Sequence, residues 1–276
     1  MSHQTQYSRP STLQEAAKLA QQSNSIALAG GALTLIGVTL PYEHVIDLQQ
    51  IPALQAIELA PDHVALGGAV SLQLVVEDRL VPDALKPALI RTLSPNLRNG
   101  ASVGESLIAP RPLREWLAVL AASDASVQTL VAGEMQEQSV EDFIALVEKN
   151  TPTGIVTKII LPRFKGRAAL GTSYVARTPA DHPIVNAAVH VQLDDETVVT
   201  SAVAVIGGAS TTPILRIDLV NLTGNPLNDM HIDHAVKPIA ALVDPVGDYK
   251  GSVAYRREMA QVCVRRALAD CLAQLS

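Results

Sequence analysis

Residues 26–31 read Ile-Ala-Leu-Ala-Gly-Gly, four apolar residues followed by two adjacent glycines. The apolar run predicts a short buried strand, and the glycines predict the turn that ends it. Because glycine has no Cβ, such a turn lets backbone N–H groups point at a ligand, and successive free N–H groups form a nest suited to a phosphate. A Gly-Gly pair after a strand is also a common tight turn, so Gly30 and Gly31 by themselves are compatible with both interpretations.

The segments around this turn predict a βαβ arrangement for the first fifty residues. Ser11 or Thr12 is placed to cap a helix, because Gln14 or Glu15 follows three residues later and completes a capping box. Residues 45–48, Val-Ile-Asp-Leu, predict a second strand.

Beyond residue 50 the sequence predicts further strands and helices. Residues 54–58 and 63–67 predict paired strands, and residues 97–104 predict a turn-rich stretch. Residues 185–193 and 198–206 predict an antiparallel hairpin. The other predicted elements are helices at 72–78, 82–92, 113–122, 140–148, 233–242 and 254–275 and strands at 126–131 and 154–161.

Together these elements predict an α+β fold in three parts. The first part is a small βαβ region at residues 1–55, and the second is a larger mixed α/β region at residues 56–164. The third part, residues 165–276, is a C-terminal antiparallel sheet with helices. A linker at residues 162–171 is the best boundary.

Composition argues against nucleic acid as a partner. The 276 residues carry a formal net charge of -6 and only 3% aromatic residues, and no run of Lys and Arg exceeds two. Duplex binding needs concentrated positive charge, and single-strand platforms need aromatic rings. The histidines do not show metal-ligand spacing, and no catalytic nucleophile with a base is apparent, so we assign neither metal ligands nor catalytic residues.

The sequence predicts a cytoplasmic protein without a transmembrane segment. The first ten residues are polar, and the apolar stretches are too short to span a bilayer. Cys263 and Cys271 are eight residues apart in a predicted helix, about 12 Å along its axis, which is too far for a disulfide. They are therefore expected to be buried thiols.

A second stretch, residues 98–104, is rich in small residues and could bring backbone amides close to a ligand, although it could also be an ordinary loop. In order along the chain, these segments resemble the FAD-binding medium subunit of molybdenum hydroxylases, the family of aerobic carbon-monoxide dehydrogenase and the FAD domain of xanthine dehydrogenase. The segments that carry the resemblance are residues 7–16, 29–31, 45–48, 66–70, 98–104, 174–186 and 255–257.

The resemblance implies a two-part FAD-binding region followed by a C-terminal antiparallel sheet. FAD would lie between the two N-terminal parts with its pyrophosphate on two glycine-containing loops, and would pass electrons from iron–sulfur clusters on a small partner subunit to an external acceptor. A large partner subunit would hold the molybdopterin. The implied cofactor-binding residues are Ala29, Gly30, Gly31, Ala32 and Leu33 in the first loop, Ala101, Ser102, Val103, Gly104 and Ser106 in the second, and Glu115 near the flavin.

Both loops depart from the family pattern. Ala32 and Leu33 stand where the first loop usually carries polar residues, and Glu105 stands where the second loop usually has a second glycine. Two hypotheses follow. Either the chain is the FAD-binding electron-transfer subunit of a molybdenum hydroxylase, or it binds FAD weakly or not at all and has a structural or assembly role.

Overall fold

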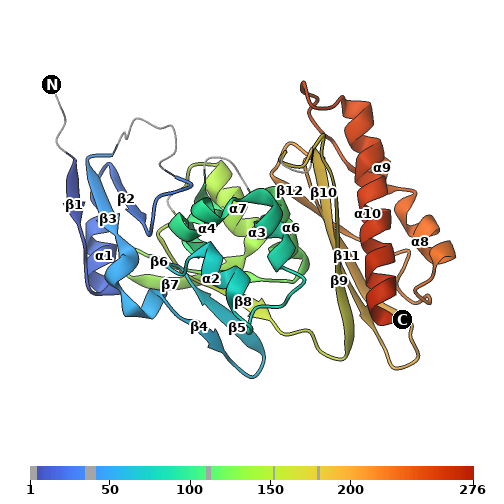
Figure 1. Cartoon of the computed structure of the whole chain (residues 1–276), viewed down its shortest axis with the longest axis horizontal. Coiled ribbons are helices and arrows are strands. Elements are labelled where there is room, and N and C mark those ends of the chain that lie inside the picture. The colour runs from blue at the N-terminus through green and yellow to red at the C-terminus, as the bar shows by residue number, and fades with distance from the viewer. Residues whose placement is uncertain (1–4, 35–41, 110–112, 152, 179–180) are drawn as a thin grey trace. The chain divides into compact units, whose positions relative to one another are not determined.

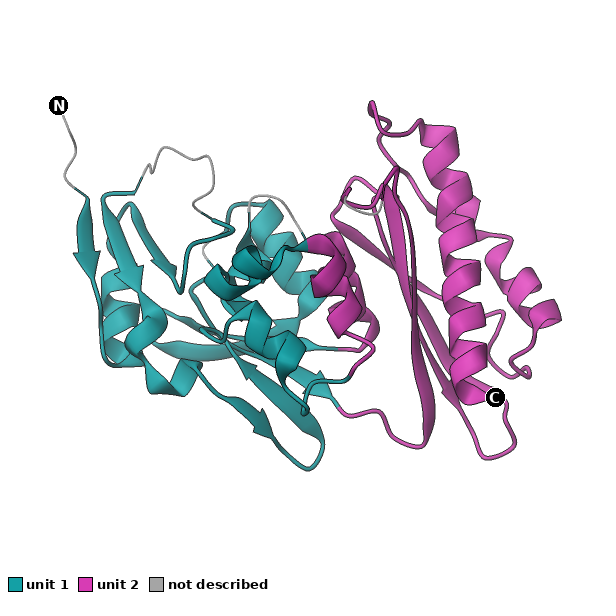
Figure 2. Ribbon diagram, viewed as in Figure 1, with its two compact units in different colours: residues 1–82, 93–113, 125–162 teal, residues 83–92, 114–124, 163–276 magenta. Residues whose placement is uncertain are grey.

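The computed structural model describes residues 5–34, 42–109, 113–151, 153–178 and 181–276. Helices and three sheets confirm the predicted α+β class. The chain divides into two compact units (Figure 2). Unit 1 comprises Met1–Pro82, Leu93–Leu113 and Ala125–Pro162, and unit 2 comprises Asp83–Thr92, Arg114–Asp124 and Arg163–Ser276. The division into three domains stays a prediction, and each predicted segment contains one sheet.

The first sheet of unit 1 is small and parallel, with the strand order β1-β3-β2. Helix α1, Leu13–Ala20, begins where the sequence predicts, because the Thr12 side chain accepts a hydrogen bond from the Glu15 backbone N–H. The predicted βαβ arrangement is therefore confirmed. The strands are β1 Gln6–Ser8, β2 Ser25–Leu28 and β3 His44–Asp47.

The second sheet of unit 1 is antiparallel, with the strand order β4-β5-β8-β6-β7. Strand β7 was not predicted, because its residues are polar and mostly exposed and show no apolar alternation. The strands are β4 Ile57–Leu59, β5 His63–Gly67, β6 Ser126–Val131, β7 Glu134–Ser139 and β8 Ile155–Pro162. The helices of unit 1 after α1 are α2 Leu72–Glu77, α4 Pro95–Gly100, α5 Val103–Ile108 and α7 Val140–Glu148, with 3-10 helices at Leu48–Gln50 and Pro52–Leu54.

Two predictions in unit 1 were wrong. Residues 97–104, predicted as turn-rich, lie mainly in α4 and α5. The small residues suggested a loop, but Ser94 and Ser102 each cap a helix with their side chains, and this local capping decides the conformation. Leu54, predicted to begin a strand, ends a 3-10 helix instead.

Unit 2 is built on an antiparallel sheet with the strand order β12-β11-β10-β9. Helix α10 packs on one face and α6 on the other (Figure 1), and the central strands β10 and β11 are therefore largely buried. The strands are β9 Arg167–Val175, β10 Val185–Leu193, β11 Val199–Gly207 and β12 Ile214–Asp218. The helices of unit 2 are α3 Lys86–Thr92, α6 Arg114–Ala122, α8 Asp229–Val236, α9 Ile239–Leu242 and α10 Val253–Leu275.

The predicted hairpin of unit 2 is confirmed as β10 and β11, but two other predictions were wrong in detail. Strand β9 begins at Arg167, inside the predicted linker. The single helix predicted at 233–242 is two helices, α8 and α9, because Pro238 has no backbone N–H and cannot continue α8. Within the described part of the chain, no helix is long and apolar enough to cross a membrane.

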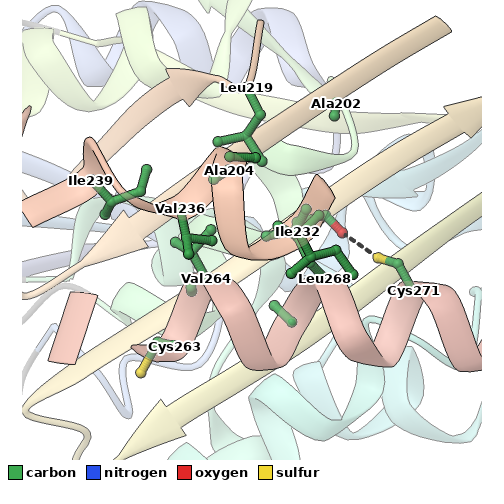
Figure 3. Packing of buried hydrophobic residues seen from close by; sticks show 14 of the residues in the cluster. Ala202, Ala204, Leu219, Ile232, Val236, Ile239, Cys263, Val264, Leu268 and Cys271 are labelled. Atoms are coloured by element: carbon green, nitrogen blue, oxygen red, sulfur yellow. Dashed lines mark hydrogen bonds between the residues drawn. The ribbon is translucent and has the colours of Figure 1, made fainter. Parts of the chain in front are cut away.

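The core between α10 and the sheet contains both cysteines (Figure 3). Cys263 and Cys271 are free and fully buried beside Val264 and Leu268, as predicted. The sulfur of Cys271 lies 3.3 Å from the carbonyl oxygen of Val189. Burial raises the pKa of Cys263 to about 11 and the pKa of Cys271 to about 12.

We expect neither thiol to react with a disulfide reagent such as DTNB in the native protein at pH 8. Burial blocks access to both sulfurs, and a thiol with a pKa near 11 is ionised to only about one part in a thousand at that pH. Absorbance at 412 nm should report no released thiolate from native protein and two equivalents per chain in guanidinium chloride. Rapid labelling of native protein would contradict the packing of α10 described above.

Candidate functional site

The Gly-Gly pair forms the predicted turn directly after β2. Gly30 has a φ of +112° and Gly31 a φ of +85°, a region that only glycine adopts readily. A Cβ on Gly30 would lie 2.2 Å from the carbonyl oxygen of Gly100. The Ala32 backbone N–H donates a hydrogen bond to the same oxygen at 3.2 Å. The first predicted loop thus lies directly against the end of α4, next to the second.

The second predicted loop is a helix start. Ser102 is the N-cap of α5, and its hydroxyl accepts a hydrogen bond from the Glu105 backbone N–H at 3.3 Å. In return, the Ser102 backbone N–H donates to Glu105 Oε2 at 3.1 Å, which completes a capping box. The Ser106 N–H donates to the Ser102 carbonyl oxygen at 3.1 Å.

The remaining backbone donors of this loop are used by the neighbouring turn at residues 67–71. Val103 N–H donates to the carbonyl oxygen of Val70, and Gly104 N–H to that of Gly68, both at 2.9 Å. The backbone N–H groups from Ser102 to Ser106 therefore all have acceptors inside the protein. The second loop therefore helps to position the site, whereas the N–H groups that could bind a ligand come from the first loop.

Glu105 brings the two loops together. Its Oε1 accepts a hydrogen bond from the Thr34 hydroxyl at 2.8 Å. The Ser102 backbone N–H donates to Oε2 at 3.1 Å. The backbone N–H groups of Gly31 and Thr34 also face this carboxylate and act to lower its pKa. The side chain is only 1% exposed. Burial raises the pKa of Glu105 above its usual range, and the hydrogen bonds from Thr34, Gly31 and Ser102 act in the opposite direction.

Sequence reasoning missed Thr34, although a signal was present. Ala32 and Leu33 suggested that the first loop lacks polar side chains, but the next residue supplies a hydroxyl that reaches the site. Glu105 was recognised as the unusual position. The sequence alone does not reveal that groups of Gly31 and Thr34 face this carboxylate, because both residues are more than seventy positions away in the chain.

A cavity opens beside Glu105 in unit 1. Ala29, Ser102 and Gly104 of the predicted binding residues line it, together with Glu105. The other predicted residues of unit 1 belong to the same two segments without lining this cavity: Gly30, Gly31, Ala32, Leu33, Ala101, Val103 and Ser106.

Glu115 lies elsewhere, in α6 of unit 2. Its carboxylate accepts hydrogen bonds from Arg91 Nη2 at 2.9 Å and from the Thr92 hydroxyl at 3.1 Å, and it is 4% exposed. The Arg91 guanidinium also lies over the Tyr174 ring, 4.7 Å from its centroid. These contacts show that Glu115 ties α6 to α3 within unit 2. Its role near a flavin stays a prediction.

Comparison with known sequences now assigns the class of protein. Residues 3–164 match the sequence model of the FAD binding domain in molybdopterin dehydrogenase, and residues 173–271 match that of the CO dehydrogenase flavoprotein C-terminal domain. The chain belongs to this family of FAD-binding medium subunits. Its cofactor class is FAD, and it is an oxidoreductase component.

Individual relatives are similar to this chain over nearly its whole length. YgfM of Escherichia coli K12 is 28% identical over 270 residues, which cover 96% of each chain. The nicotine 6-hydroxylase medium subunit of Paenarthrobacter nicotinovorans is 26% identical over 277 residues, again 96% of each. A chain of the solved carbon-monoxide dehydrogenase of Hydrogenophaga pseudoflava has the same fold, with a TM-score of 0.82 at 20% identity and 99% of each chain covered.

The donor set of the site fits an anionic group. Backbone N–H groups of Gly31, Thr34 and Ser102 converge on one pair of carboxylate oxygens, which is the arrangement that also binds phosphate oxygens. A flavin diphosphate would therefore find suitable donors in the first loop. In this structure Glu105 accepts from those donors.

Proposed function

We propose that this chain is the FAD-binding, electron-transfer subunit of a molybdenum hydroxylase. The observation that supports this best is the convergence of backbone N–H groups from the Gly30–Gly31 turn on an anionic group, in a chain that matches the family from end to end. FAD, when bound, supplies a two-electron carrier that can pass electrons on singly. The protein binds and orients it.

The proposal assigns the diphosphate to the first loop. Gly31 and Thr34 would donate backbone N–H groups to it, and the Thr34 hydroxyl would add a further donor. Ala29, Ser102 and Gly104 would line the space beside it. The other predicted residues of both loops would hold the backbone in place, and Glu115 would support the adjoining helices of unit 2.

The relatives support a proposal about partners. Several relatives are named medium subunits or medium chains of larger enzymes, such as nicotine 6-hydroxylase and carbon-monoxide dehydrogenase. We infer that this chain assembles in the cytoplasm with a large molybdopterin-containing subunit and a small iron–sulfur subunit. Electrons would arrive from the iron–sulfur clusters and leave to an external acceptor.

The test is reconstitution of the full chain with FAD. We expect the purified protein to take up close to one FAD per chain, with flavin absorption bands near 370 and 450 nm that remain after gel filtration. Bovine serum albumin treated in the same way controls for nonspecific flavin. A chain that remains colourless at saturating FAD, while circular dichroism shows it folded, would overturn the proposal.

A further inference from the structure

We propose that Glu105 is an internal competitor of the cofactor, a carboxylate that occupies the anion site of the Gly30–Gly31 turn and so sets the affinity of this chain for FAD. The inference rests on the proposed function, because it concerns the same site.

The hydrogen bonds of Glu105 exceed what helix capping requires. A capping box uses one backbone N–H, here that of Ser102. Glu105 also accepts the Thr34 hydroxyl at 2.8 Å, and the backbone N–H groups of Gly31 and Thr34 favour its charged form. These groups belong to the other loop and not to α5. The carboxylate therefore behaves as a ligand of the first loop.

Helix α1 provides an internal comparison. Glu15 stands at the same position relative to its N-cap, Thr12, and its carboxylate accepts the Ser11 backbone N–H at 3.2 Å. Glu15 is exposed, whereas Glu105 is buried. The two residues occupy the same helix position, but Glu15 accepts from the residue before its N-cap, whereas Glu105 accepts from its own N-cap and from Thr34 of the first loop. The contact with the first loop is therefore what distinguishes Glu105.

Carboxylate and phosphate oxygens compete for these donors. Both are anionic acceptors, and a backbone N–H that is directed at one is not available to the other. Two negative groups in one buried nest also repel each other, and such like-charge juxtaposition strongly disfavours binding. FAD can therefore enter only when the Glu105 carboxylate leaves the nest. Burial, which raises the pKa of Glu105, already disfavours the ionised carboxylate there.

The experiment compares FAD affinity among variants of the full chain. Glu105→Gly removes the carboxylate and should lower the Kd for FAD about a hundredfold, as expected for relief of a close like-charge contact. Glu105→Gln keeps the size but not the charge, and should give a smaller gain of about tenfold. Quenching of flavin fluorescence measures the Kd, and circular dichroism verifies the fold of each variant.

Two controls separate competition from general loosening. Glu15→Gly makes the same substitution at the same helix position and should leave the Kd for FAD within twofold of the wild type. Riboflavin, which carries no phosphate, should bind the wild type and Glu105→Gly equally. A gain that is specific to FAD and to position 105 supports the inference.

The outcomes also separate this inference from the proposed function. Equal FAD affinity in the wild type and in both Glu105 variants, with one FAD bound per chain, would overturn the inference alone. Equal gains for FAD and riboflavin would overturn it too, since the diphosphate would not be the group affected. No FAD uptake by any folded variant would overturn the proposed function together with the inference. If Glu105→Gly does not fold, Glu105→Gln gives the same comparison.

Discussion

Replacing Gly30 with alanine should lower the free energy of unfolding by about 3 kcal/mol. A non-glycine residue with a left-handed backbone costs roughly 1–2 kcal/mol, and forcing an atom into a packed site costs roughly 1–3 kcal/mol more. Both terms apply, because φ is +112° and the new Cβ would lie 2.2 Å from the backbone oxygen of Gly100. Urea denaturation followed by circular dichroism measures the loss.

Gly133 provides the matched control for this substitution. It also has a positive φ, +92°, but a Cβ there would meet no atom within 4 Å. Gly133→Ala should therefore cost only the backbone term, about 1 kcal/mol. Equal losses at the two positions would mean that the contact between the Gly-Gly turn and the end of α4 does not constrain Gly30.

Replacing Arg256 with alanine should destabilise the protein by a similar amount, about 3 kcal/mol. Its Nη1 donates to the carbonyl oxygens of Ile184 and Gly208 at 2.7 and 2.8 Å, and its Nη2 pairs with Asp248 at 2.8 Å. The side chain is 6% exposed. Truncation leaves two carbonyl groups at the ends of the sheet without their donor, and this is the main cost. Thermal and urea unfolding report it.

The neighbouring arginine is the control. Arg257 approaches Asp244 at 3.6 Å, and both side chains are largely exposed. An exposed pair of this kind contributes about 0.5 kcal/mol or less. Arg257→Ala should therefore unfold close to the wild-type midpoint. If both arginine variants show the same loss in free energy of unfolding, the buried hydrogen bonds of Arg256 do not contribute the stability expected of them.

Local chemistry explains which parts of the fold the sequence predicts well. The Gly-Gly turn, the cap at Thr12 and the hairpin of β10 and β11 each depend on residues close together in the chain. The same local chemistry explains the error at residues 97–104, where small residues suggested a loop but Ser94 and Ser102 cap helices. Capping side chains are a better guide there than the frequency of glycine and serine.

The candidate site was predicted only in outline, because its chemistry is non-local. The sequence identified both glycine-containing segments and the unusual Glu105. It could not show that the donors of Gly31 and Thr34 meet that carboxylate, since this contact depends on how the first loop packs against α4 and α5. Glu105, which the sequence suggested would obstruct FAD, is hydrogen-bonded within the protein in the structure.

The discontinuous make-up of unit 2 has a consequence for how this protein can be divided. The two family models meet between residues 164 and 173, yet α6, from the middle of the first match, covers one face of the C-terminal sheet. A C-terminal fragment that begins at this junction would expose the apolar sheet face that α6 covers. The N-terminal fragment would contain α6 without that sheet. The boundary between the two sequence families is therefore not a boundary between modules, and neither half alone would keep both faces of the C-terminal sheet covered.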